Sequence, residues 1–153
     1  MRDAVAIRGV VDADFAQWLP LWDGYNRFYG RSGATALPVA ITRTTWSRFL
    51  DDAEPVHALV AESQGTLLGL AHYLFHRSTT RIEPTCYLQD LYVDDGARGL
   101  GIGASLIAIA QARAQENGAA RLYWQTHETN TVARALYDKL AQRTGFIVYA
   151  KGI

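Results

Sequence analysis

A cluster of glycines between a predicted strand and a predicted helix constrains this chain more than any other feature of its sequence. Gly99, Gly101 and Gly103 follow the apolar run Thr85–Val93 and precede an alanine-rich helical pattern that ends near Asn117. Glycines at the start of a helix leave backbone N–H groups uncovered, and the helix dipole adds partial positive charge at the same place. The order of strand, glycine loop and helix therefore predicts a site for a phosphate-bearing ligand.

The spacing of these glycines does not fit the common nucleotide sites. The third glycine of the dinucleotide pattern GxGxxG is missing, and no acidic residue on a following strand completes a ribose site. No lysine followed by Ser or Thr forms the phosphate loop of an NTPase. A nucleotide-binding α/β domain is therefore disfavoured, while a glycine-rich turn without a ligand stays open as an alternative.

The rest of the sequence alternates between strand and helix patterns. Strands are predicted at Val5–Val10, Val56–Glu62, Thr66–His76, Thr85–Val93, Leu122–Thr126 and Phe146–Lys151. Helices are predicted from Phe15 to Phe28, with a kink or break at Pro20, and at Ile41–Leu50 and Asn130–Ala141. This order predicts an α+β domain in which helices cover the faces of a mixed sheet.

Length and composition limit the possible classes of protein. A chain of 153 residues with 49% hydrophobic content suits one domain, spanning residues 1–153, with a real core. Lys plus Arg and Asp plus Glu both number 15, so the formal net charge is zero and a non-specific nucleic-acid binder is disfavoured. The one cysteine, Cys86, excludes an intramolecular disulfide and a multi-cysteine zinc site, which suits a reducing compartment.

The sequence also argues against export and membrane insertion. Arg2, Asp3 and Arg8 interrupt the N-terminal region, which therefore lacks the apolar core of a signal peptide. No stretch reaches the roughly 20 apolar residues of a membrane span, since Gln111 and Arg113 close the most apolar region. We therefore expect a soluble cytoplasmic protein with no membrane partner.

Three separate motifs carry a resemblance to a known family. The segment Arg98–Gly103 resembles the (Q/R)xxGx(G/A) signature of the GNAT superfamily of N-acetyltransferases. The preceding Tyr87–Val93 looks like the fourth strand of that family, and Asn130–Phe146 looks like its downstream motif. The closest likeness is to the diamine-acetyltransferase-like and yeast histone/polyamine acetyltransferase-like branch. It rests on Trp22, Gly24, Tyr25, Phe28, Tyr29, Leu136, Tyr137, Asp138 and Lys139.

The resemblance covers nearly the whole chain and implies both a fold and an activity. The fold would be a central, mostly antiparallel mixed sheet of six to seven strands with about four helices. The activity would be transfer of the acetyl group of acetyl-CoA, without a metal, to a primary amine such as a polyamine, an amino acid or a lysine-type acceptor. A coenzyme A-binding regulatory or sensor module without turnover is the alternative, because an intact glycine loop fits both.

The resemblance also assigns a coenzyme site. The pyrophosphate would rest on the amides of the glycine loop, and the pantetheine arm would pair with the end of the fourth strand as an added strand. Asn130 would cap the last helix and hydrogen-bond the coenzyme. The coenzyme-binding set is Leu91, Tyr92, Val93, Arg98, Gly99, Leu100, Gly101, Ile102, Gly103, Ala104 and Asn130.

Acetyl transfer needs a proton donor for the departing thiolate and a proton acceptor for the amine. Tyr137 matches the catalytic tyrosine of the family, and the alternative is an aromatic side chain that packs on the core. Gln89 stands where diamine acetyltransferases tend to carry a glutamate, and an amide cannot accept the proton. Asp90 is adjacent, but strict alternation would place it on the opposite face from Gln89 unless a bulge intervenes. A water chain, His127 or Glu128 are the other candidates.

The acceptor site is expected in the first helix. Trp22, Asp23, Tyr25 and Tyr29 combine aromatic rings with one carboxylate, which suits a cationic amine, and Gln89 would contribute from the fourth strand. The alternative is that Trp22 and Tyr25, which fall at helical spacing, pack in the core. The apolar strand predicted at Phe146–Lys151 and the habits of the branch also lead us to expect a homodimer.

Overall fold

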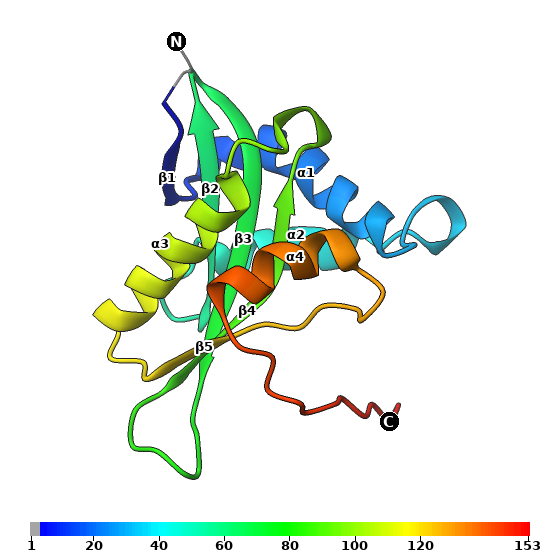
Figure 1. Ribbon diagram of the computed structural model, residues 1–153. Coiled ribbons are helices and arrows are strands. Elements are labelled where there is room, and N and C mark those ends of the chain that lie inside the picture. Colours follow the sequence, from blue (N-terminus) through cyan, green and yellow to red (C-terminus); the bar gives the residue numbers. More distant parts are fainter. Residues whose placement is uncertain (1–3) are drawn as a thin grey trace.

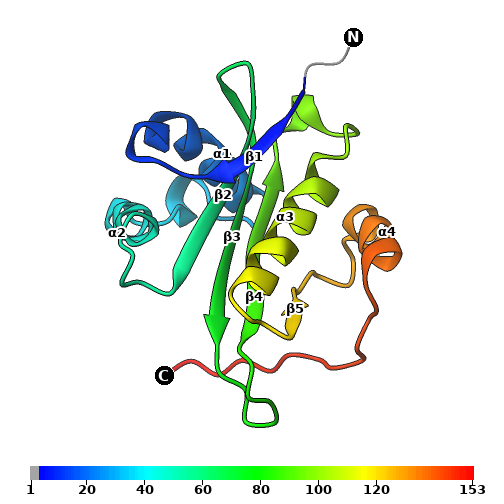
Figure 2. The ribbon, with the colours of Figure 1, turned by 90° about the vertical axis from the view of Figure 1, so that its left-hand side faces the viewer.

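The computed structural model describes residues 4–153 and shows a mixed sheet with helices on both of its faces (Figures 1 and 2). The strands are β1 (Ala6–Gly9), β2 (Val56–Ser63), β3 (Thr66–His76), β4 (Thr85–Val93) and β5 (Arg121–Tyr123). The helices are α1 (Phe15–Phe28), α2 (Val39–Phe49), α3 (Ile102–Glu116) and α4 (Thr131–Leu140), with short 3₁₀ turns at Asp12–Asp14, Gly33–Thr35 and Asp95–Ala97. The strands lie in sequence order, and the fold is therefore of the α+β class that the sequence predicts.

The sheet separates two hydrophobic clusters. Successive side chains of a strand point to opposite faces, so Leu59 of β2 packs beneath α3, whereas its neighbour Val60 packs beneath α1 and α2. Four aromatic rings lie close together in the second cluster, and the centroids of Trp18 and Trp46 are 4.9 Å apart. These clusters fix α1 and α3 on opposite faces of β3 and β4, as Figure 2 shows.

The central hairpin follows from the sequence of its turn. Gln64 and Gly65 both adopt a positive φ, of 50° and 78°, which is the geometry of a tight turn between twisted antiparallel strands. Ser63 and Thr66 therefore pair directly, and β2 and β3 continue the pairing to Val56 and Leu74. The predicted hairpin is confirmed.

A bulge interrupts the pairing of β3 with β4. His72 pairs with Asp90, but the next residue of β3, Tyr73, pairs with Leu88, so Gln89 is an extra residue in β4. An extra residue reverses the alternation of side chains on one side of the bulge. Leu88 therefore packs in the cluster beneath α3, while Asp90 lies against His72 on the face that α1 covers.

Close approach of α1 to β4 depends on a glycine. A Cβ atom at Gly24 would lie 2.5 Å from the hydroxyl oxygen of Tyr92. With any larger residue the side chain of Tyr92 would have to shift, so the glycine favours a close approach of α1, which brings Tyr25 and the adjoining Tyr29 toward β4. The helix also runs unbroken through Pro20, so the expected break there is wrong.

The expected sheet of six to seven mostly antiparallel strands is also wrong. The described chain forms a mixed sheet of five strands, with three antiparallel pairings followed by the parallel pairing of β4 with β5. The strand predicted at Leu122–Thr126 ends at Tyr123, because the chain then leaves β4. The segment predicted as a strand at Phe146–Lys151 is exposed and forms no regular structure, because no neighbouring strand pairs with it.

Two further observations concern the helices and the cysteine. None of the helices within residues 4–153 combines the length and the apolar character that crossing a membrane requires. Cys86 lies fully buried on β4 beneath α3, and burial raises the pKa of its thiol to about 11. The thiol therefore packs as an apolar side chain.

Candidate active site

The glycine loop has the geometry of an anion site. Gly99 and Gly101 adopt φ values of 80° and 77°, a left-handed backbone that favours glycine. Gly101 is the N-cap of α3 and provides no side chain to satisfy the N–H groups of the first turn. The first amide that bonds back is that of Ser105, which donates to the carbonyl of Gly101 at 3.0 Å.

The consequence is a row of free donors. Within the described chain, the backbone N–H groups from Gly99 to Ala104 have no hydrogen-bond acceptor. They lie at the positive end of the 15-residue helix α3. Arg98 adds a guanidinium that is anchored by Asp95, at 3.0 Å, and by the carbonyl of Val93, at 3.3 Å. Together these groups can hold the two charges of a pyrophosphate.

The edge of β4 opens next to this loop. Pairing with β5 is confined to Thr85–Tyr87, so the residues from Leu88 to Val93 have no strand on that side within residues 4–153. An unpaired strand edge presents backbone N–H and C=O groups that an extended, amide-bearing chain can bind. Leu91, Tyr92 and Val93 lie on this open stretch, between the bulge and the glycine loop.

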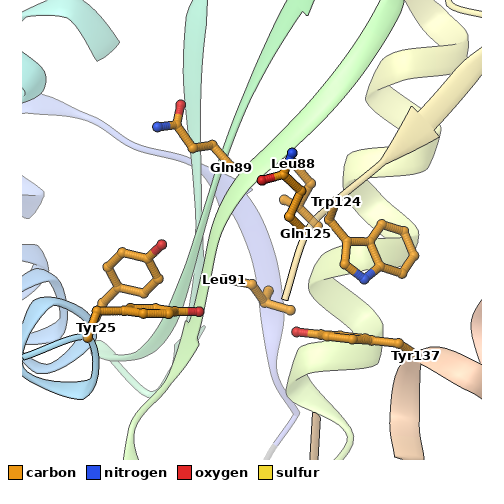
Figure 3. A pocket seen from close by; sticks show the side chains of 8 residues that line it. Tyr25, Leu88, Gln89, Leu91, Trp124, Gln125 and Tyr137 are labelled. Carbon is orange, nitrogen blue, oxygen red and sulfur yellow. The ribbon is translucent and has the colours of Figure 1, made fainter. Parts of the chain in front are cut away.

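A small pocket lies where β4 and the chain after β5 separate (Figure 3). Its walls come from α1, β4, the chain after β5 and α4. The lining residues are Tyr25, Tyr29, Leu88, Gln89, Leu91, Trp124, Gln125 and Tyr137. Tyr25 lies on one side in Figure 3, and the hydroxyl end of Tyr137 points into the pocket from the other. The structure thus brings the predicted proton donor and two predicted acceptor-binding tyrosines to one pocket.

Tyr137 is held by its helix and by a neighbouring ring. Asn130 caps α4, because its side-chain oxygen accepts a hydrogen bond from the N–H of Ala133 at 3.4 Å, which confirms the predicted cap. The ring of Trp124 packs edge-on against Tyr137 with centroids 5.5 Å apart. Burial, together with the nearby Tyr29, raises the pKa of Tyr137, so its hydroxyl is protonated at neutral pH.

Asp90 does not line the pocket itself, but its charge acts on Tyr25 and Tyr29, which do. Its carboxylate is 2.9 Å from Nδ1 of His72. Burial, the charge of Asp90 and a hydrogen bond to its carboxylate raise the pKa of Tyr25. Burial first and then Asp90 also raise the pKa of Tyr29. The bulge at Gln89 is what turns this carboxylate toward α1, the possibility that the sequence left open.

Other predicted residues lie elsewhere. Trp22 is buried in the core and donates its indole N–H to Thr42 at 3.2 Å, while its ring stacks on Tyr25. Asp23 is exposed on α1 and does not line the pocket. His127 and Glu128 are likewise exposed outside the pocket, and Nδ1 of His127 bonds the hydroxyl of Thr129 at 2.7 Å.

Several residues of the site have no signal in the sequence. His72 and Trp18 reach Asp90 from β3 and α1 through the core, and Trp124 and Gln125 belong to the chain that leaves the sheet. Arg31 places its guanidinium 5.9 Å from the ring centroid of Tyr25 and 5.5 Å from that of Tyr29. Among residues 4–153, no group of three or more metal-ligating side chains is gathered at one place.

Solved acetyltransferases have the same fold. The aminoglycoside N-acetyltransferase AAC(6')-Iy in complex with CoA superposes with a TM-score of 0.82 over 99% of this chain and 97% of that one, at 17% identity. A structure described as a probable acetyltransferase reaches a TM-score of 0.83 over 97% of each chain, at 23% identity. These likenesses show that the chain has the fold of these proteins.

The chain belongs to the Acetyltransferase (GNAT) family, whose model matches residues 18–141. It is 32% identical to the D-amino-acid N-acetyltransferase HPA3 of Saccharomyces cerevisiae, over 99% of this chain and 92% of that protein. It is also 30% identical to the uncharacterized N-acetyltransferase YhfO of Bacillus subtilis, over 96% and 97% of the two chains. The resemblance read from the sequence is confirmed, and the protein is an acyl-CoA-dependent N-acetyltransferase.

Proposed function

We propose that this enzyme transfers the acetyl group of acetyl-CoA to the primary amine of a small molecule, and that amino acids are its acceptor class. The observation that carries the proposal is the pocket in which Tyr137 faces Tyr25 and Tyr29. It adjoins both the open edge of β4 and a carboxylate. An acyl donor and a cationic amine can therefore meet there.

The coenzyme binds through the backbone in this proposal. The free N–H groups from Gly99 to Ala104 hold the pyrophosphate, with Arg98 beside them. The pantetheine arm pairs with Leu91–Val93 as an added strand and brings the thioester to the pocket. Asn130, at the start of the helix that carries Tyr137, contributes a further hydrogen bond to the coenzyme. No metal takes part.

The chemistry follows from the groups in the pocket. Attack by the neutral amine forms the C–N bond, gives the carbonyl oxygen a negative charge and then breaks the C–S bond. Tyr137 donates its proton to the departing thiolate and regains one from the attacking nitrogen, which loses a proton as the amide forms. The bulge leaves Gln89 unpaired, so that backbone N–H groups at this point can stabilise the oxyanion. Asp90 receives the proton that the ammonium loses before attack.

Charges around the pocket support an amino acid as the acceptor. Asp90 is available to the ammonium group, and the aromatic faces of Tyr25 and Tyr29 suit a cation. Arg31, packed over the same two rings, is a partner for a carboxylate. The yeast relative is a D-amino-acid N-acetyltransferase by name, which supports the same class. A polyamine or a lysine side chain has no carboxylate next to its amine, so it could not pair with Arg31.

A thiol-release assay tests the proposal. Purified protein is incubated with acetyl-CoA and, separately, with D-amino acids, L-amino acids, spermidine and a lysine peptide. We expect the amino acids to release coenzyme A fastest, with a matching amount of N-acetylated product by mass spectrometry. Preference for spermidine or for the peptide would replace the acceptor class and leave the acetyl transfer in place.

The alternative is a coenzyme A-binding sensor without turnover. Binding of acetyl-CoA and CoA raises the melting temperature in either case, because any ligand that binds only the native state stabilises it. A thermal shift with no thiol release on any amine would identify the sensor. Tyr137 and its raised pKa favour the enzyme, because a sensor has no need of a proton donor at the thioester.

We also propose a cytoplasmic homodimer. The side chains from Phe146 to Tyr149 are apolar and between 67% and 89% exposed. A groove of about 270 Å³ lies between α3, the edge strand β5 and the end of α4. An exposed apolar segment and an unfilled groove in the same chain support pairing between two copies.

Ile147→Asp should give a monomer by sedimentation, whereas Ile82→Asp, at an exposed loop position, should remain a dimer. A monomeric wild-type protein at micromolar concentration would contradict the dimer.

A further inference from the structure

A line of hydrogen-bonded side chains runs from the core to the pocket. The indole Nε1 of Trp18 donates to Nε2 of His72 at 3.1 Å, and Nδ1 of His72 lies 2.9 Å from Oδ2 of Asp90. The carboxylate of Asp90 lies next to Tyr25, which lines the pocket. Trp18 is fully buried and His72 is 2% exposed, so water does not reach the inner part of this line.

The indole donor determines the direction of the hydrogen bonds from Trp18 through His72 to Asp90. An indole N–H can only donate, so Nε2 of His72 must accept and carries no proton. The proton of the imidazole is therefore on Nδ1, from which it is donated to Asp90. A second proton on Nε2 would place two N–H groups of His72 and Trp18 face to face in a buried site, which is costly.

We propose that Tyr25 and Asp90 form the path by which the acceptor ammonium loses its proton, and that His72 and Trp18 are positioning residues that keep Asp90 free to receive it. This proposal rests on the proposed function. In the step, the ammonium gives a proton to the hydroxyl oxygen of Tyr25 while the hydroxyl proton of Tyr25 passes to Asp90. The amine becomes neutral, Asp90 becomes protonated, and Tyr25 is unchanged.

Trp18 makes the path end at Asp90. Without the indole, no donor would hold Nε2 of His72 as an acceptor, and the imidazole could adopt the Nε2–H tautomer, which cannot donate to Asp90. With the indole in place, His72 donates to Asp90 and has no free nitrogen to take its proton. Asp90 therefore returns its proton to solvent through the pocket when the product leaves.

The other side chains around Asp90 and His72 do not replace Tyr25 and Asp90 as the proton path. Tyr29, just after α1, and Tyr87 of β4 are close enough to Asp90 to feel its charge, but burial first and then that charge raise the pKa of both tyrosines. From α2, Phe49 packs on His72 with ring centroids 4.5 Å apart and cannot titrate. The cation of Arg31 lies over the rings of Tyr25 and Tyr29, on the outer side of the path.

A double-mutant cycle tests the path itself. Tyr25→Phe and Asp90→Asn should each lower kcat by about 10²-fold, and the double variant should be no slower than either single variant, because both break one path. Coenzyme affinity should stay unchanged in all three. Tyr73→Phe, which removes the hydroxyl of a buried tyrosine beneath α3, is the control for loss of a tyrosine hydroxyl. Multiplying losses, or near-normal turnover of either single variant, would overturn the path.

The role of Trp18 is tested by freeing His72. Trp18→Phe keeps a ring in the core and removes the N–H, so we expect kcat to fall by roughly 10-fold while coenzyme affinity stays unchanged. Thr42→Val is the matched control, because it removes the hydrogen bond of the other indole, that of Trp22, in the same cluster. An unchanged kcat in Trp18→Phe, or an equal fall in Thr42→Val, would overturn the positioning role.

Imidazole nitrogen NMR tests the same inference without turnover. The signals of His72, assigned with His72→Gln, should show a protonated Nδ1 and an unprotonated Nε2 in the wild type, because Trp18 and Asp90 dictate this tautomer. An Nε2–H tautomer would overturn the inference even if the enzyme is fully active. The expected tautomer in a protein that acetylates no amine would instead show that the line exists and that the proposed function fails.

Discussion

The two halves of the site are built from different parts of the polypeptide. The coenzyme half consists of backbone groups: the free N–H groups from Gly99 to Ala104 and the open edge of β4. The acceptor half that we propose consists of side chains, chiefly Tyr25, Asp90 and Arg31. A backbone site depends on conformation and tolerates most side-chain changes, whereas a side-chain site depends on each functional group.

The difference also explains how one family can serve many acceptors. A loop that binds through its amides needs glycine only where φ is positive, so its sequence stays recognisable while its ligand stays the same. An acceptor site made of side chains from α1, β4 and the loop after α1 can change its chemistry one residue at a time. The coenzyme is therefore predictable from the motif, and the acceptor is not.

Gly101→Asp should have the largest effect of the substitutions that separate the halves. An aspartate in this loop forces a left-handed backbone on a residue with a Cβ and places a carboxylate against the pyrophosphate. We expect at least about a 10³-fold loss of acetyl-CoA affinity by calorimetry, corresponding to about 4 kcal/mol.

The control for this substitution is Gly118→Asp. Gly118 follows the other end of α3 with the same φ of 77°, and at both glycines the space that a Cβ would occupy is open. Its strain should lower the melting temperature by a similar amount while coenzyme affinity is kept. Equal losses of affinity in the two variants would show that the loop acts through stability and not through its amides.

Tyr137→Phe should come next and should affect only the chemical step. The ring and its contact with Trp124 remain, and only the proton donor is lost. We expect kcat to fall by about 10²-fold with unchanged coenzyme affinity. Full turnover with a lowered melting temperature, as one missing hydrogen bond would give, would show that Tyr137 is structural.

Arg31→Ala should have a moderate effect that is confined to one class of acceptor. The KM for an amino acid should rise by about 10-fold, because the carboxylate loses one charge-assisted partner, worth about 1.5 kcal/mol. The KM for the corresponding amine without a carboxylate should not change. An equal rise for both acceptors would remove Arg31 from the acceptor half and leave only the amine-binding groups.

Leu100→Ala should have the smallest effect, although it lies in the middle of the loop. The side chain of Leu100 is 48% exposed and the backbone amide is kept, so coenzyme affinity should change by less than about 3-fold, or about 0.6 kcal/mol. A loss as large as that of Gly101→Asp would contradict a site built from backbone groups.

Sequence reasoning predicts the strand, the glycine loop and the helix of the proposed coenzyme half because local chemistry determines them. The glycine spacing, the apolar strand before it and the alanine-rich helix after it lie within one continuous stretch, Thr85–Glu116. The cap at Asn130 and the hairpin turn at Gln64–Gly65 are equally local, and both are predictable.

The acceptor half is less predictable because it depends on long-range packing. The bulge at Gln89 decides which face Asp90 occupies, and only the pairing of β4 with β3 reveals it. His72 and Trp18 are 54 residues apart, and their hydrogen bond has no counterpart in any local pattern. Trp22 shows the converse, since a residue predicted for the acceptor site occupies a core position hydrogen-bonded to Thr42.

The end of the chain shows the limit of composition as a guide. Phe146–Lys151 is apolar and alternates little, which suits a buried strand, but a strand also needs a neighbour with which to pair. Within the described chain this segment has none, and it remains exposed. Strand propensity without a partner therefore does not determine a strand.

The central claim, that the two halves meet at the pocket between Tyr25 and Tyr137, is tested most directly with a bisubstrate ligand. Coenzyme A joined through an acetyl bridge to the amine of alanine would occupy both halves at once. We predict that it binds at least about 10²-fold more tightly than coenzyme A, and that Arg31→Ala removes about 10-fold of this gain without weakening coenzyme A itself. Equal affinities of the conjugate and of coenzyme A for the wild-type enzyme would contradict the claim.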